Sequence, residues 1–136
     1  MVTRFFPGRY ESLAEIAEFV RLESKKAGLT FKDIFEIETA VDEAVSNIIE
    51  HAYGGEGIGE ITCTCIPSAE SMKIILEDHG MPFNPACIPV PDISAQLEER
   101  ENHGLGYFLM CRLMDDIHFE FREGLNQLTM VKHKTH

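Results

Sequence analysis

The sequence predicts an α+β fold in which a mixed, mostly antiparallel sheet carries helices on one face. Two observations lead to this class. Apolar residues early in the chain recur at helical spacing, whereas from Gly59 onward they alternate with a period of two, as in half-buried strands. The later strands are also joined by short turns, at residues 67–70 and 123–126, which pairs them as hairpins. This arrangement favours a two-layer α/β sandwich over a doubly wound parallel sheet.

The chain opens with VTRFFP, which predicts a short edge strand that ends at Pro7. Ser12 follows, and Glu15 stands three residues later, the spacing of a capping box at a helix start. Gly28 ends this helix. Its apolar face carries Leu13, Ile16, Ala17 and Val20.

A second, longer helix is predicted over residues 31–53. Thr30, with Asp33 three residues on, gives the start signal, and a glycine pair at 54–55 ends the helix. The apolar face consists of Ile34, Ile37, Val41, Ala44, Val45, Ile48 and Ala52.

Two hairpins and one more helix complete the chain. The segments EITCTCI and MKIILED form the first hairpin, and IHFEF and QLTMVKH form the second. A helix introduced by glycine is predicted over residues 105–114, between the hairpins. Residues 85–103 contain several prolines and the charged run EERE, so we expect a long mobile loop, of the kind that often forms a functional lid.

Length and charge limit the classes of function. At 136 residues the chain fits one domain, residues 1–136, and its net charge of −11 argues against direct binding to nucleic acid. Every apolar run is shorter than the roughly 20 residues of a membrane span, and the start lacks the apolar middle of a signal peptide. We therefore expect a soluble cytoplasmic protein, without membrane contact, whose partners are proteins or small molecules.

The cysteines do not indicate a metal ribbon or a disulfide framework, because their spacing and density fit neither. We expect free, buried thiols at Cys63, Cys65, Cys87 and Cys111.

A row of polar residues in the second helix is the first candidate site. Glu43, Asn47 and His51 follow at intervals of four residues, so their side chains lie along one side of the helix. Asn is a poor helix former, and its amide oxygen suits the hard cation Mg²⁺. Glu43, one turn earlier, could act as a general base. The same spacing also fits the solvent edge of an amphipathic helix.

The second candidate follows the apolar strand KIILE. Asp78 stands at the strand end with Gly80 two residues on, so the carboxylate could accept a hydrogen bond from an exocyclic amine while the backbone closes around a flat ring. An ordinary turn is the alternative.

The third candidate is the start of the last helix, where Gly104 and Gly106 leave free N–H groups that favour phosphate. Close packing of a short helix would explain the glycines equally. Neither the dinucleotide fingerprint nor a Walker lysine is present.

Taken together, these residues resemble the anti-sigma-factor serine/threonine kinases, which belong to the histidine-kinase-like (GHKL) ATPase superfamily with its Bergerat fold. FEIETAVDEAVSNIIEHAYGG resembles the family's N-box, EDHGMPFNP its adenine-binding glycine box, and HGLGYFLMCRLMDD its second glycine box. ESLAEIAEFV resembles the first helix, so the likeness runs nearly end to end.

The resemblance implies a role for each matching residue. Glu43 would be the catalytic base, and Asn47 would hold Mg²⁺ against the phosphates of ATP or ADP. Asp78 would receive the adenine amino group, and Gly80 would give the ring room. Residues 85–103 would form the ATP lid.

The phosphate side of the site would be supplied by the backbone of Gly104, Leu105 and Gly106. Relatives often carry Arg just before this glycine pair, where Asn102 and His103 stand here, so we expect Arg100 to take the arginine's part. The sequence departs from the family twice more. Pro82 replaces a glycine of the glycine box, and Asn126 stands where the last hairpin usually bears a Thr near adenine.

The implied activity is transfer of the γ-phosphoryl group of ATP to a Ser or Thr of an anti-sigma-factor antagonist, by a homodimer that also sequesters a sigma factor or similar regulator. Two alternatives stay open: a weakly active or inactive ATP-binding module that serves as a partner switch, and a purely structural interaction domain without nucleotide.

Overall fold

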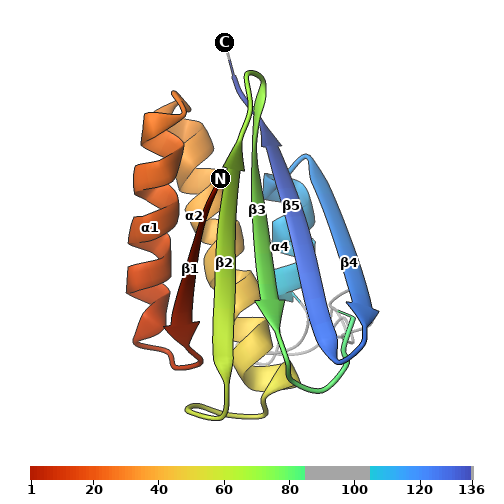
Figure 1. Cartoon of the computed structure of the whole chain (residues 1–136). Coiled ribbons are helices and arrows are strands. Elements are labelled where there is room, and N and C mark those ends of the chain that lie inside the picture. The colour runs from red at the N-terminus through yellow and green to blue at the C-terminus, as the bar shows by residue number, and fades with distance from the viewer. Residues whose placement is uncertain (85–104, 136) are drawn as a thin grey trace.

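A computed structural model describes residues 1–84 and 105–135 of the chain. The order of elements is strand, two helices with a short π-helix, two strands, a helix and two strands (Figure 1). They are β1 (Val2–Pro7), α1 (Ser12–Lys26), α2 (Phe31–Asn47), η1 (Ile48–Ala52), β2 (Glu60–Pro67), β3 (Ser71–Asp78), α4 (Leu105–Leu113), β4 (Asp116–Arg122) and β5 (Leu125–His133).

The strands form one five-stranded sheet in the order β1-β2-β3-β5-β4. All its strand pairings among the described residues are antiparallel, so the expectation of a partly parallel sheet was wrong. The helices α1, α2 and α4 lie together on one face of the sheet (Figure 1). The predicted two-layer α+β sandwich is confirmed. Within the described residues, no helix combines the length and apolarity needed to cross a membrane.

The core lies between the helices and one face of the sheet. Cys63, Ile74 and Met130 point into it from β2, β3 and β5 and are fully buried, as is Ile37 of α2. Truncating Ile37 to Ala would remove buried apolar surface and leave a cavity in the core. We expect this to lower the free energy of unfolding by about 2–5 kcal/mol.

One of the two predicted side-chain caps at a helix start is confirmed. Thr30 caps α2, since its hydroxyl accepts a hydrogen bond from the N–H of Asp33 at 3.2 Å. The capping box at Ser12 was wrong: Ser12 is the first residue of α1, and its buried Oγ donates to the carbonyl oxygen of Pro7 at 2.7 Å. The hydroxyl therefore ties the helix to the preceding strand.

The second helix changes its winding near its end. The α-helical part stops at Asn47, and the π-helix η1 carries the chain on, with the N–H of Tyr53 bonded to the carbonyl of Ile48 at 3.0 Å. A π turn has more residues per turn than an α-helix. His51 therefore leaves the row of Glu43 and Asn47, and its exposed ring lies 6.0 Å from that of Phe83.

The final hairpin turns earlier than its sequence predicts. Glu123 and Gly124 both have positive φ, 54° and 77°, as a two-residue turn between antiparallel strands requires. Leu125 and Asn126 already belong to β5 and are not turn residues. Asn126 consequently pairs with Asp78 of β3 and points into the protein.

The cysteines follow their prediction in part. Cys63 and Cys65 are buried free thiols on the helix-facing side of β2, as expected. Cys111 is exposed on α4, so the expectation of burial was wrong there. Cys87 lies outside the described residues.

Candidate functional site

A narrow pocket between the end of α2 and the sheet brings together three polar residues. Asn47 is the last residue of α2, and Asp78 is the last residue of β3. Asn126 is the residue of β5 that pairs with Asp78. The remaining walls are apolar and consist of Ala44, Ile48, Leu76, Phe83, Phe119 and Leu128. Two residues that the sequence places far apart, Asn47 and Asp78, thus face one space.

The carboxylate of Asp78 is held in place by donors at the pocket wall. Its Oδ1 accepts hydrogen bonds from the N–H of Gly80 at 2.9 Å and from Nδ2 of Asn126 at 2.8 Å. Asp78 is 2% exposed, and this burial raises the pKa of its carboxyl, against the smaller lowering by the two donors. The group is therefore a fixed acceptor whose charge a ligand can stabilise further.

The amide of Asn126 has a fixed orientation. Its Nδ2 donates to Asp78 and to the carbonyl oxygen of Met81, the latter at 3.0 Å, so Oδ1 must point elsewhere. That oxygen is buried and has no hydrogen-bond partner among residues 1–84 and 105–135, and the same holds for Nδ2 of Asn47. Leaving such an atom unsatisfied costs about 1–3 kcal/mol. Two of them beside one pocket indicate a polar ligand.

Gly80 allows the turn after β3 to touch the end of η1. A Cβ at this position would lie 2.5 Å from the carbonyl oxygen of Ala52, and the N–H of Met81 bonds to the same oxygen at 2.8 Å. The missing side chain therefore leaves room for the η1 backbone, which shapes the pocket indirectly.

Glu43 lies against the start of α4. A Cβ on Gly106 would come within 2.5 Å of Oε2 of Glu43, so the glycine makes space for this carboxylate. Partial burial, followed by the charge of Glu50, raises the pKa of Glu43. The arrangement puts a proton acceptor beside a helix start, one turn before Asn47.

Two aromatic side chains, which sequence reasoning missed, narrow the pocket. The ring of Phe83 lies 5.7 Å from that of Phe119, and together they leave a free volume of about 10 Å³. A purine is many times larger, so Phe83 must move before one enters. The place of Phe119 between the polar residues His118 and Glu120 in β4 was the available signal, and for Phe83 it was its place just after the turn.

The chain matches the family model of the histidine kinase-like ATPase domain over residues 6–132. It belongs to this family. The resemblance recognised in the sequence is thereby confirmed.

Curated relatives of this ATPase domain include the "Serine-protein kinase RsbW" of Bacillus mycoides (strain KBAB4), which is 31% identical over 126 residues, 90% of this chain and 78% of the relative. The protein of the same name from Bacillus cereus (strain G9842) has the same identity and coverage.

Two solved structures share the fold of this ATPase domain. The RsbU and RsbW domains of a Mycobacterium tuberculosis protein align with all of the chain, with a TM-score of 0.66 and 13% identity. The chain spans 34% of that protein's length. The catalytic domain of histidine kinase ThkA aligns over 99% of both chains, with a TM-score of 0.57 and 17% identity. At these identities the likeness shows the fold alone.

Membership in an ATPase family implies use of a nucleotide, and the hydrogen-bond acceptors of the pocket fit one. Asp78 and Asn126 both line the pocket, and each has an oxygen that can accept a hydrogen bond from an exocyclic amine. For the metal, no group of three or more His, Cys, Asp or Glu side chains suitable for a cation occurs in residues 1–84 and 105–135. Mg²⁺ commonly takes one or two protein ligands and completes its shell with water and phosphate. A single amide at Asn47 fits that habit.

The remaining predicted residues lie at or beyond the limit of the description. Arg100, Gly104 and the lid over 85–103 are outside the described residues. Leu105 and Gly106 begin α4, whose first N–H groups have no partner within the helix.

Proposed function

We propose that the chain is an ATP-dependent serine/threonine protein kinase that acts as an anti-sigma regulatory factor. Its substrate would be a Ser or Thr of an anti-sigma-factor antagonist, and it would also sequester a sigma factor or similar regulator. The name and the 31% identity of the Bacillus relatives support this activity. The observation that carries it is the pocket in which Asn47, Asp78 and Asn126 meet, where two buried polar atoms have no partner within the described part of the chain.

In this proposal the adenine ring lies in the pocket once Phe83 has moved. The carboxylate of Asp78 accepts a hydrogen bond from the exocyclic amine, and Oδ1 of Asn126 accepts a second one directly or through water. The apolar walls cover the two ring faces. A guanine would instead bring its O6 oxygen against these acceptors, so the pocket favours ATP over GTP.

The phosphates then extend toward Asn47 and the start of α4. The amide oxygen of Asn47 would hold Mg²⁺, which neutralises phosphate charge when bound. The backbone at Gly104, Leu105 and Gly106 would donate N–H groups to the phosphates, and Arg100 would add a positive charge.

Glu43 is the residue that would receive the proton. As the hydroxyl oxygen of the substrate Ser or Thr bonds to the γ-phosphorus, its proton passes to the carboxylate of Glu43, and the bond from phosphorus to the bridging oxygen breaks to release ADP. The raised pKa of Glu43 makes it a stronger base than an exposed glutamate. We expect the kinase to work in the cytoplasm as a homodimer.

A phosphotransfer assay tests this function. The wild-type protein is incubated with γ-labelled ATP and a panel of purified anti-sigma-factor antagonist proteins, beside the Glu43→Gln variant. We expect label on one antagonist with wild type and none with the variant, while both bind ADP. If both bind ATP and neither labels any antagonist, the chain is a nucleotide-dependent switch module and not a kinase.

A further inference from the structure

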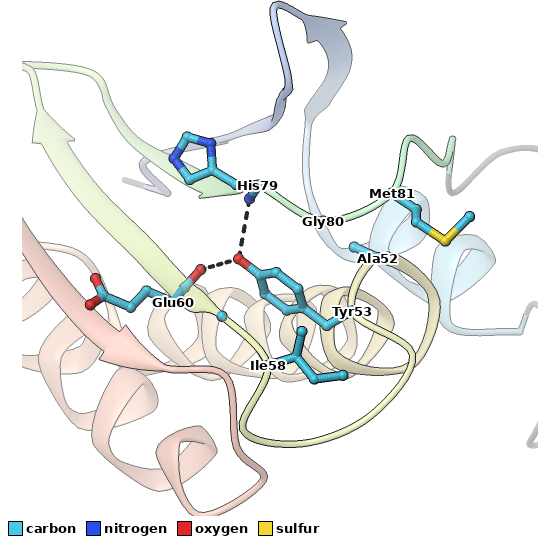
Figure 2. Close-up of a pocket in the computed structure, with 8 residues that line it drawn as sticks. Ala52, Tyr53, Ile58, Glu60, His79, Gly80 and Met81 are labelled. Carbon is cyan, nitrogen blue, oxygen red and sulfur yellow. Dashed lines mark hydrogen bonds between the residues drawn. The ribbon is translucent and has the colours of Figure 1, made fainter.

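A second, larger cavity lies beside the turn formed by residues 79–81. It is an open cleft of about 650 Å³, bounded by the end of η1, the loop before β2 and the turn itself (Figure 2). Its volume is in the range of ligand sites, about 300–1,000 Å³. The carboxyl-bearing residue Asp78 does not line it, so the cleft is separate from the pocket proposed for adenine.

The turn lines the cleft and is hydrogen-bonded to Asn126, which lines the pocket. On the cleft side, the hydroxyl of Tyr53 accepts a hydrogen bond from the N–H of His79 at 3.1 Å and donates to the carbonyl oxygen of Glu60 (Figure 2). On the pocket side, the carbonyl of Met81 accepts from Asn126. A shift of the turn in the cleft would therefore act on Asn126, and a displaced Asn126 would act on the turn.

The rim of the cleft is apolar and exposed. Ile58 is 64% and Met81 is 71% exposed, and both line the cleft together with the half-buried ring of Tyr53. Single exposed apolar residues are ordinary, but large ones grouped around a hollow are typical of docking sites. An apolar side chain inserted between them would remove both from water.

The charge of the cleft selects the occupant. Glu60 is exposed and lines it, and its carboxylate forms no ion pair with any residue in the described part of the chain. The chain as a whole carries −11. Figure 2 draws the side chain of Glu60 directed away from the Tyr53 ring, at the edge of the cleft. A cationic side chain that reaches this edge would pair with Glu60 while a neighbouring apolar side chain packs against Ile58 and Met81.

We propose that this cleft binds a segment of a protein partner in which an apolar side chain stands next to an arginine or lysine, and that its occupancy is linked to nucleotide binding through the turn at 79–81. The linkage rests on the proposed nucleotide function, whereas the docking site does not. Linkage is reciprocal: if the segment changes the affinity for ADP by some factor, ADP changes the affinity for the segment by the same factor.

The test uses isotope-labelled wild-type protein and two probe peptides, N-acetyl-Leu-Arg-Leu-amide and N-acetyl-Leu-Glu-Leu-amide. Amide shifts in the NMR spectrum are followed on titration with each. We expect the arginine peptide to shift the amides of residues 58–60 and 79–81 and the glutamate peptide to leave them in place. Glu60→Gln should weaken the arginine peptide about two- to fivefold. This substitution keeps the Tyr53 bond, which uses the backbone of Glu60.

Ile58→Lys should weaken the same peptide about tenfold, through lost apolar contact and added like charge. Leu22→Lys, a matched change at an exposed leucine of α1, should have no effect. Equal shifts by both peptides, no shifts at 58–60 and 79–81, or an unaltered affinity in Ile58→Lys would overturn the docking site.

ADP titrated into the same sample separates the two proposals. We expect saturating arginine peptide to change the ADP dissociation constant severalfold. An unchanged constant overturns the linkage alone. If ADP does not bind while the arginine peptide does, the nucleotide function fails and the docking site stands.

Discussion

Asn126 donates from Nδ2 to Oδ1 of Asp78 at 2.8 Å, and the two side chains are 1% and 2% exposed. The bond crosses from β5 to β3 between residues that are direct register partners. It uses one carboxylate oxygen as an acceptor within the protein and turns the oxygen of Asn126 away from Asp78. The rest of the proposed adenine recognition depends on this pair.

Asp78→Asn should weaken ATP binding, because an amide offers N–H where the ligand amine needs an acceptor. Hydrogen bonds to charged groups contribute about 1.5–3 kcal/mol, so we expect a loss of roughly 10–100-fold in affinity, measured by calorimetric titration. Glu77→Gln is the control, since Glu77 lies next in β3 on the opposite face of the sheet. Equal ATP affinities in the two variants would exclude Asp78 from the site.

Stability without nucleotide should depend on pH through Asp78. Burial raises the pKa of Asp78 in the folded protein above its unfolded value, about 3.9. Between those two values the folded state binds more protons, so the free energy of unfolding falls as the pH rises through this window. Asp78→Asn should remove this fall in denaturant unfolding curves. An identical pH dependence in wild type and variant would contradict the assigned direction.

Gly106→Ala should reduce phosphotransfer while leaving the fold nearly intact. The new Cβ would meet the end of the Glu43 side chain, which is flexible and can swing away, so the thermal midpoint should move little. The displaced carboxylate would no longer be positioned as a general base. Such a base raises the reaction rate about 10²–10⁴-fold. We expect the turnover number to approach that of Glu43→Gln. A fully active Gly106→Ala protein would contradict the role of Glu43 as the general base.

Much of the fold could be predicted from periodicity, because the buried residues of α2, β2, β3 and β5 recur at the regular spacing of a helix or a strand. The cap at Thr30 was also predictable, because its hydroxyl bonds to a residue only three positions further along the chain. Ser12 was not, because its hydroxyl bonds to the strand before it at Pro7. The π turn after Asn47 also left no sequence signal that we recognised.

In the site, too, the residues in short local motifs could be predicted, whereas the contacts between distant segments could not. The sequence offers Asn47, Asp78 and Gly106 through short motifs, but that Glu43 touches Gly106 follows only from how α4 packs on α2. Phe83 and Asn126 acquire their importance from partners distant in sequence, Phe119 and Asp78. Spacing along one element cannot reveal such pairs.

Phe83→Ala should speed nucleotide association. The ring fills the pocket against Phe119 and His51, and aromatic contacts of this kind contribute about 0.5–1.5 kcal/mol each. Removing it should raise the association rate constant of a fluorescent ADP analogue roughly two- to tenfold, measured by stopped flow. Phe35→Ala, at an exposed position of α2 that does not line the pocket, is the control. Identical rates in Phe83→Ala and wild type would show that the ring does not limit entry.

A crystal structure with Mg²⁺ and a non-hydrolysable ATP analogue tests the central claim most directly. The account predicts the exocyclic amine of adenine within hydrogen-bond distance of the Asp78 carboxylate, the metal on the amide oxygen of Asn47, and the Phe83 ring displaced. A nucleotide bound elsewhere, with Phe83 still packed on Phe119 beside Asp78, would contradict it.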